Sequence, residues 1–200
     1  MERTKERILL EALDLFAREG YEAVSVRDIA DRVGLTKGAL YRHYRSKRDI
    51  FDSILARMEQ RDADLARESR LPEGPKEEME DAYAAASPAQ IAAFGKVMFR
   101  YWTEDAFASR FRRLLTLEQY RDPEMGRLCQ QYLVSGPLDY LTDLFAALGR
   151  PEPRKEAAEV YGPMFLLWGV YDGSKDPAGV TALADGLLDA AAARMGEGKE

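Results

Sequence analysis

Residues 24–51 read VSVRDIADRVGLTKGALYRHYRSKRDIF, and the way this stretch divides into helices decides the fold. Ser25 and Asp28 form an S-x-x-D pattern, in which each residue can cap the other at the first turn of a helix. That helix begins just after Ser25 and ends near Gly34, and Thr36 can then cap a short third helix. Two short helices joined by a tight turn that contains glycine predict a helix-turn-helix.

Helical periodicity extends to both sides of this stretch. Residues 4–19 place apolar side chains on one face and end before Gly20, a residue suited to the left-handed conformation that terminates helices. A long helix is expected from Ser46 to about Ser69, opened by a second S-x-x-D pattern. Acid-rich residues 76–81 predict a solvated connection. Strand-like alternation is never sustained, so the expected fold class is all-α.

More helices are expected in the rest of the chain, at residues 88–103, 107–120, 123–148, 156–171 and 178–195. Gly-Pro pairs at positions 136–137 and 162–163 fall inside two of them, where the missing proline amide should kink or interrupt the helix. We therefore predict two domains. Residues 1–47 form a three-helix domain with the helix-turn-helix, and residues 48–200 form a larger helical domain.

The charge of the chain is unevenly distributed. In total, 29 Lys and Arg stand against 35 Asp and Glu, and the formal net charge of -6 argues against a polyanionic partner. Residues 1–55 nevertheless hold eleven basic and ten acidic side chains. Within them, residues 32–48 contain six Lys or Arg and no acid, beside Tyr41, His43 and Tyr44. A short basic stretch interleaved with aromatic residues is typical of a nucleic-acid contact.

The short third helix would present small and basic residues outward. This helix is expected over about residues 37–44. A rotation of 100° per residue turns Leu40 and Tyr44 inward and leaves Lys37, Gly38, Tyr41 and Arg42 on the outer face. Glycine would let the helix backbone approach base edges in a major groove, while Lys, Arg and Tyr donate to phosphates or guanine acceptors. A basic helix face is often only solvated, and the capped helix-turn-helix around this one is what favours DNA.

Residues 24–51, together with the preceding helix of residues 7–16 and Gly20-Tyr21, resemble the DNA-binding signature of the TetR/AcrR family of bacterial transcriptional regulators. The motif covers roughly the first 55 residues. The rest of the chain is similar only in length, helicity and its terminal pair of helices. The resemblance implies an N-terminal helix-turn-helix DNA-binding domain followed by a helical ligand-binding and dimerisation domain.

Carried over position by position, the resemblance implies ten DNA contacts: Ser25, Arg27, Thr36, Lys37, Gly38, Ala39, Tyr41, Arg42, His43 and Lys47. Arg27 and Lys37 are expected to read bases. Phosphate contacts are expected from Ser25, Tyr41, His43 and Lys47.

The resemblance also implies a homodimer held by the last two helices of each subunit. The apolar residues that suit such an interface are Tyr161, Met164, Leu183, Leu187, Leu188 and Ala191, although the same residues could pack the core of one subunit. A small-molecule pocket is implied inside the larger domain. Its expected lining is Trp102, Phe107, Phe111, Glu118, Tyr120, Tyr140, Phe165 and Trp168, in which Glu118 could face a cationic ligand. Each of these aromatic residues could equally be plain core, and a surface salt bridge is the alternative for Glu118.

Enzymatic and metal chemistry find little support in the sequence. His43 is the one histidine and Cys129 the one cysteine, so neither a histidine-based triad nor a cysteine zinc site is expected. We therefore expect no enzyme, no metal and no cofactor. Cys129 is expected to be a packed side chain. No apolar run reaches the roughly 20 residues of a membrane span, and a cytoplasmic location without a membrane partner is expected.

These patterns together predict a homodimeric DNA-binding transcriptional regulator. We expect a repressor that a small apolar or amphipathic ligand releases from a palindromic operator in double-stranded DNA. The alternative is a DNA-binding activator or architectural protein without a small-molecule inducer.

Overall fold

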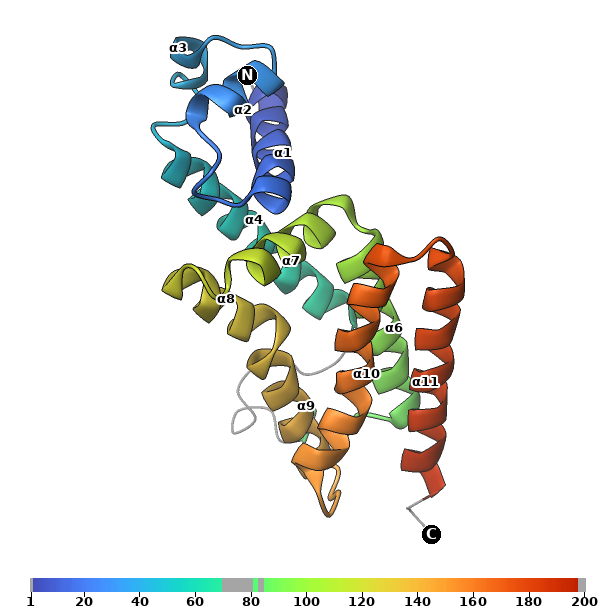
Figure 1. The fold of residues 1–200 in the computed structure, drawn as a ribbon. Coiled ribbons are helices and arrows are strands. Elements are labelled where there is room, and N and C mark those ends of the chain that lie inside the picture. Colours follow the sequence, from blue (N-terminus) through green and yellow to red (C-terminus); the bar gives the residue numbers. More distant parts are fainter. Residues whose placement is uncertain (1, 70–80, 83–84, 198–200) are drawn as a thin grey trace. The chain divides into compact units, whose positions relative to one another are not determined.

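The computed structural model describes residues 2–69, 81–82 and 85–197, and within them every regular element is an α-helix (Figure 1). The all-α prediction is therefore confirmed. The helices are α1 (Glu2–Glu19), α2 (Val26–Arg32), α3 (Lys37–Leu40), α4 (Lys47–Ser69), α6 (Pro88–Glu104), α7 (Ala106–Glu118), α8 (Pro123–Leu133), α9 (Ser135–Ala147), α10 (Pro153–Gly173) and α11 (Pro177–Glu197). The predicted acid-rich connection lies outside the described residues except for Asp81.

The chain divides into two compact units. The first comprises Met1–Asp64 and Ala106–Cys129, and the second comprises Leu65–Asp105 and Gln130–Glu200. This division differs from the predicted domains of residues 1–47 and 48–200. The physical reason is that α7 packs along α1, so a segment from the middle of the chain joins the first unit.

In the first unit, α1, α2, α3 and α4 enclose a core whose largest fully buried side chains include Phe16, Ile29, Leu40 and Phe51. The predicted caps of α2, α3 and α4 are confirmed, the last by the Asp49 amide, which donates to the Ser46 hydroxyl at 3.0 Å. Ser25 and Asp28 form a reciprocal capping box at the start of α2, and the hydroxyl of Thr36 accepts the Ala39 amide at 3.1 Å. Each cap fixes the start of its helix, and α2 ends just before Gly34, whose φ of 66° turns the chain toward α3.

The third helix is shorter than predicted. Its backbone changes to tighter hydrogen bonds after Leu40, because the amide of His43 donates to the carbonyl of Leu40 at 2.8 Å, three residues back. Tyr44 is nevertheless buried, as the periodicity indicated, and its hydroxyl donates to the carbonyl of Lys5 at 3.2 Å. Burial, followed by the charges of nearby carboxylates, raises the pKa of Tyr44 from 10.0 to about 12.

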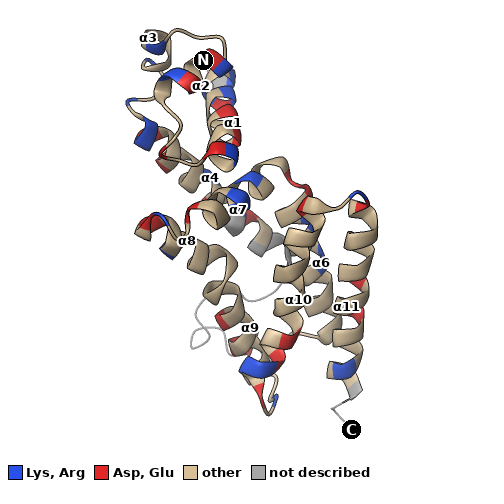
Figure 2. Cartoon of the chain, viewed as in Figure 1, with Lys and Arg blue, Asp and Glu red and all other residues tan. Residues whose placement is uncertain are grey.

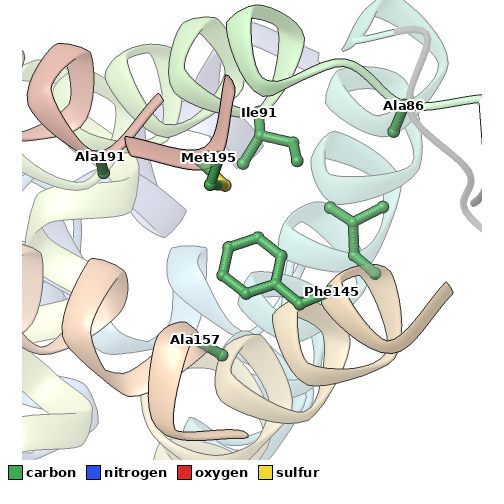
Figure 3. Packing of buried hydrophobic residues seen from close by; sticks show 7 residues of the cluster. Ala86, Ile91, Phe145, Ala157, Ala191 and Met195 are labelled. Carbon is green, nitrogen blue, oxygen red and sulfur yellow. The ribbon is translucent and has the colours of Figure 1, made fainter. Parts of the chain in front are cut away.

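In the second unit, α10 packs against α9 and α11, and α11 packs against α6. Figure 3 shows part of the core, in which Ile91, Phe145 and Met195 point toward one another beside Ala157 and Ala191. Alanine at these positions lets the helix axes approach closely, which is the ordinary way in which antiparallel helices bury their apolar faces. Among the described residues, no helix is both long enough and apolar enough to cross a membrane.

The two Gly-Pro pairs behave differently. The predicted helix 123–148 is interrupted at Val134, next to the first pair, and this prediction is confirmed. A Cβ at Gly136 would lie 2.0 Å from the carbonyl oxygen of Gln131, so only glycine fits the break. The second pair causes no break, because α10 runs through Pro163.

Candidate nucleic-acid interface

The outer face of α3 and of the turn that follows it carries exposed basic and aromatic side chains. Leu40 is completely buried and fixes the helix, while Lys37, Gly38, Tyr41 and Arg42 are exposed. The Lys37 ammonium lies 5.9 Å from the centroid of the Tyr41 ring, so the two side chains share one surface. Figure 2 shows the concentration of Lys and Arg on α3 and near the start of α4. This face therefore offers several donors on a rigid, capped turn.

Gly38 has no structural need to be glycine. A Cβ at this position would meet nothing within 4 Å, and its backbone does not have a positive φ. Glycine inside a helix lowers stability by about 0.5–1 kcal/mol relative to alanine. Without a side chain at Gly38, the backbone of α3 is open to close approach from outside the subunit.

Three of the six basic residues in the window 32–48 serve the fold. Arg32 bonds to Glu11 at 2.9 Å and to Asp14 at 3.2 Å. Arg48 donates to Asp52 at 2.6 Å and to both oxygens of Glu124 at 2.5 and 2.7 Å. These hydrogen bonds lower the pKa of Glu124 below its ordinary value and raise the pKa of Arg48. The third of these residues, Lys47, binds backbone.

Lys47, a predicted phosphate contact, is bound within the subunit. Its ammonium donates to the carbonyl oxygen of Tyr21 at 2.7 Å and lies 4.3 Å from the centroid of the Tyr21 ring. The side chain is only 21% exposed. Lys47 therefore holds the loop between α1 and α2 in place.

Ser25 is also occupied within the protein. Its hydroxyl lies 2.6 Å from Oδ2 of Asp28, and because a carboxylate only accepts, the serine hydrogen points there and not toward a phosphate. This bond is the main reason that the pKa of Asp28 is lowered. Arg27 stays exposed, with Asp31 at 3.8 Å as a loose partner. Ser25 therefore caps α2, and Arg27 is exposed in the first turn of the same helix.

The remaining predicted contacts lie where an external partner could reach them. Thr36 is exposed, and Ala39 and His43 are half-buried. Arg45, which was not among the predicted contacts, is exposed beside them. Within the described part of the chain, Lys37, Arg42 and Arg45 form no ion pair. Their charge is therefore available to a ligand.

The predicted pocket residues do not form one site. Trp102, Phe165 and Trp168 belong to the second unit, where the Trp168 ring centroid lies 6.1 Å from Trp102 and 5.5 Å from Phe165. Tyr140 lies apart from them against Phe94, with 6.5 Å between ring centroids.

Phe107 and Phe111 are buried and belong to the first unit. Tyr120 is 91% exposed after the end of α7, and its predicted place in a pocket wall is wrong. Glu118 is buried in the first unit, and its Oε1 accepts the amide of Tyr21 at 3.2 Å. It binds backbone and is not a counter-charge for a ligand.

The predicted dimer residues divide into two groups. Leu183 and Leu187 are exposed on α11, and the neighbouring helix α10 exposes Phe165, Leu166 and Val170. The others do not suit a surface contact, because Met164, Leu188 and Ala191 are buried within the subunit and Tyr161 is half-buried. The apolar surface therefore consists of residues that the sequence pattern only partly identified.

Metal-ligating groups are scattered in the structure. Among the described residues, no three His, Cys, Asp or Glu side chains come together as they would around a metal ion. Cys129 is buried with its sulfur 3.6 Å from the Oε1 of Gln119, and burial raises the pKa of its thiol. It is a packed side chain, as expected.

Residues 8–54 match the family described as bacterial regulatory proteins, tetR family. The HTH-type transcriptional repressor KstR2 of Rhodococcus jostii (strain RHA1) is 50% identical over 44 residues, which are 22% of this chain and 22% of that protein. The relatives that match by sequence are covered over only 16% to 26% of their length.

Two solved structures share the fold over most of the chain. The fatty acid degradation regulator FadR from Bacillus halodurans has a TM-score of 0.58 at 18% identity, covering 94% of each chain. SmeT in its complex with triclosan has a TM-score of 0.60 at 19% identity, covering 96% of this chain and 91% of SmeT. At these identities, the likeness concerns the fold alone.

Proposed function

We propose that this chain is a DNA-binding transcriptional regulator, like the bacterial regulatory proteins of the tetR family that residues 8–54 match. The observation that carries the proposal is the outer face of α3. Lys37, Tyr41 and Arg42 are exposed there around Gly38, on a helix that Leu40 anchors. An α-helix with small and basic outer residues fits the major groove, where arginine and lysine donate to guanine.

The proposed regulator is a homodimer. The exposed apolar side chains of α10 and α11, which include Leu166 at 67% and Leu183 at 52% exposure, support a contact between two copies. A two-fold dimer matches a palindromic operator, whose half-sites then lie about 34–36 Å apart or a multiple of that distance. KstR2 is a repressor, and repression is the mode of action that we propose for this chain.

The proposed release signal is a small apolar or amphipathic ligand. SmeT, which shares the fold, is known in complex with triclosan. In this chain, the rings of Tyr161, Phe165 and Trp168 on α10 and of Trp102 on α6 form an aromatic cluster suited to such a ligand. Ligand binding would release the operator only if the ligand favours a conformer that binds DNA less tightly.

The test is the affinity for DNA. A fluorescent duplex carrying the sequence that the protein selects from a random pool is titrated with wild-type protein and with Lys37→Ala and Tyr41→Ala. Each substitution removes an exposed donor of α3, so each should weaken binding by about tenfold or more without unfolding the protein. Lys175→Ala, which removes an exposed cation of the second unit, is the control and should bind as the wild type does.

Unchanged affinity in both α3 variants would reject α3 as the reading element. Failure of the wild-type protein to enrich any duplex would reject DNA binding altogether. Raising the salt concentration should weaken binding steeply, because cations that contact phosphates displace condensed counterions.

A further inference from the structure

We propose that Glu118 is a positioning residue for the DNA-binding motif. From the end of α7, its carboxylate holds the loop between α1 and α2 and thereby sets the orientation of α2. The inference rests on the proposed function and extends it to a residue 64 positions beyond the family match at residues 8–54.

The carboxylate of Glu118 is placed inside the first unit. Glu118 is only 3% exposed, and its Oε1 accepts the backbone amide of Tyr21 at 3.2 Å. Arg121, one turn further along the chain, lies 3.6 Å from the same oxygen. A carboxylate is costly to bury, so its place against a backbone amide 97 residues away indicates a specific contact.

The loop is shaped around this carboxylate. Gly20 has a φ of 92°, a conformation that residues with a side chain rarely adopt. A Cβ at Gly20 would lie 2.4 Å from Oε1 of Glu118. Glycine is therefore required twice, once by the backbone turn and once by the approach of Glu118.

Tyr21 is held from the opposite side as well. Its carbonyl accepts Lys47 of α4 at 2.7 Å, and its ring packs against Phe16 at 5.0 Å and Phe51 at 5.3 Å between centroids. The peptide groups of Tyr21 are thus fixed by one hydrogen bond from α7 and one from α4. Removing the bond from Glu118 leaves the loop held on one side only.

The position of this loop determines the position of α2. The capping residue Ser25 follows Tyr21 by four residues, and Arg27 lies in the first turn of α2. A second link runs from α7 to α2 through α1, because Asp14 bonds to Arg110 at 2.8 Å and to Arg32 at 3.2 Å. A displacement of α7 would therefore move the start of α2 and with it an expected base-reading side chain.

The test compares Glu118→Ala with Glu118→Gln. Alanine removes the acceptor and leaves the amide of Tyr21 unpaired, whereas glutamine keeps an oxygen that can accept it. Binding of the selected duplex by the folded fraction of Glu118→Ala should weaken by about tenfold, because the binding-competent arrangement of α2 becomes less populated. Glu118→Gln should bind within about threefold of the wild type. Glu59→Ala, which removes an exposed acid of α4, is the control and should not change the affinity.

Two further readouts separate positioning from general stability. Hydrogen exchange at the Tyr21 amide should accelerate in Glu118→Ala under conditions where the protein remains folded. The dependence of affinity on salt should keep the wild-type slope, because no phosphate contact is lost. If Glu118→Ala unfolds at the assay temperature, Gly20→Ala tests the same contact from the loop side and should weaken binding of the folded protein.

Wild-type affinity in the folded fraction of Glu118→Ala or of Gly20→Ala overturns the proposal, as does an equal loss in Glu118→Gln. These outcomes differ from a failure of the proposed function, in which the wild-type protein itself binds no duplex.

Discussion

Asp14 offers the sharpest test of what holds the first unit together. Its side chain is 9% exposed and lies among three arginines: Arg110 at 2.8 Å, Arg32 at 3.2 Å and Arg18 at 3.2 Å. The arginines themselves are 34–66% exposed, so water screens each pair, and about 0.5–1 kcal/mol for each is the appropriate scale. Replacement by alanine regains about 0.5 kcal/mol of helix propensity. Asp14→Ala should therefore lower the free energy of unfolding by about 1–2.5 kcal/mol.

The assay is urea denaturation followed by circular dichroism. Asp31→Ala is a matched control, because Asp31 also pairs with an arginine four residues away on the same helix, but at 3.8 Å and with 70% exposure. Its free energy of unfolding should change by less than about 0.5 kcal/mol. The reasoning would be refuted if Asp14→Ala were as stable as the wild type. It would also be refuted if Asp31→Ala lowered the free energy of unfolding by as much as Asp14→Ala does, because burial would then not affect the contribution of these ion pairs.

Three further changes have clear expected outcomes. Leu183→Lys should make a dimer dissociate in sedimentation experiments, whereas Val97→Lys, at an equally exposed apolar position on α6, should not. Arg48 lowers the pKa of Glu124, so the pair stabilises the folded state above about pH 4.5, and this stabilisation is lost as the pH falls. Glu124→Gln should therefore flatten the dependence of the urea midpoint on pH in this range. Tyr120→Ala should leave the free energy of unfolding within about 0.5 kcal/mol of the wild type, because the ring is exposed.

The helix caps and the buried face of the DNA-binding motif could be predicted because they depend on residues close together in the sequence. The capping box of Ser25 and Asp28 and the cap at Thr36 depend on residues three positions apart, and their outcomes could be read directly from the sequence. Burial of Leu40 and Tyr44 followed from the helical period. Each of these features needs only neighbours in the chain.

Contacts between distant segments were not predictable. Periodicity assigns Glu118 to a helix, but it cannot show that the nearest donor is the amide of Tyr21, 97 residues away. The same limit applies to Tyr120, because a helical wheel extended past the end of α7 continued an apolar face that the chain does not continue. The Gly-Pro pairs illustrate it again, since a carbonyl oxygen lies 2.0 Å from the Cβ position of Gly136 while nothing lies within 4 Å of that of Gly162.

Some basic residues of the window 32–48 bind within the subunit and others are open to DNA. This limits how strongly the DNA affinity of one subunit can depend on salt. Three of the six cations in this window are bound within the subunit. Lys37, Arg42 and Arg45, together with Arg27 from α2, are exposed without a close carboxylate and can contact phosphates or bases. If all four contacted phosphates, the affinity of one subunit would fall with salt with a logarithmic slope of no more than about -3.6. A dimer on two half-sites would double it to about -7. A measured slope near about -7 at the selected duplex would support two bound subunits, whereas a slope near about -3.6 would indicate a single bound subunit and contradict the proposed dimer.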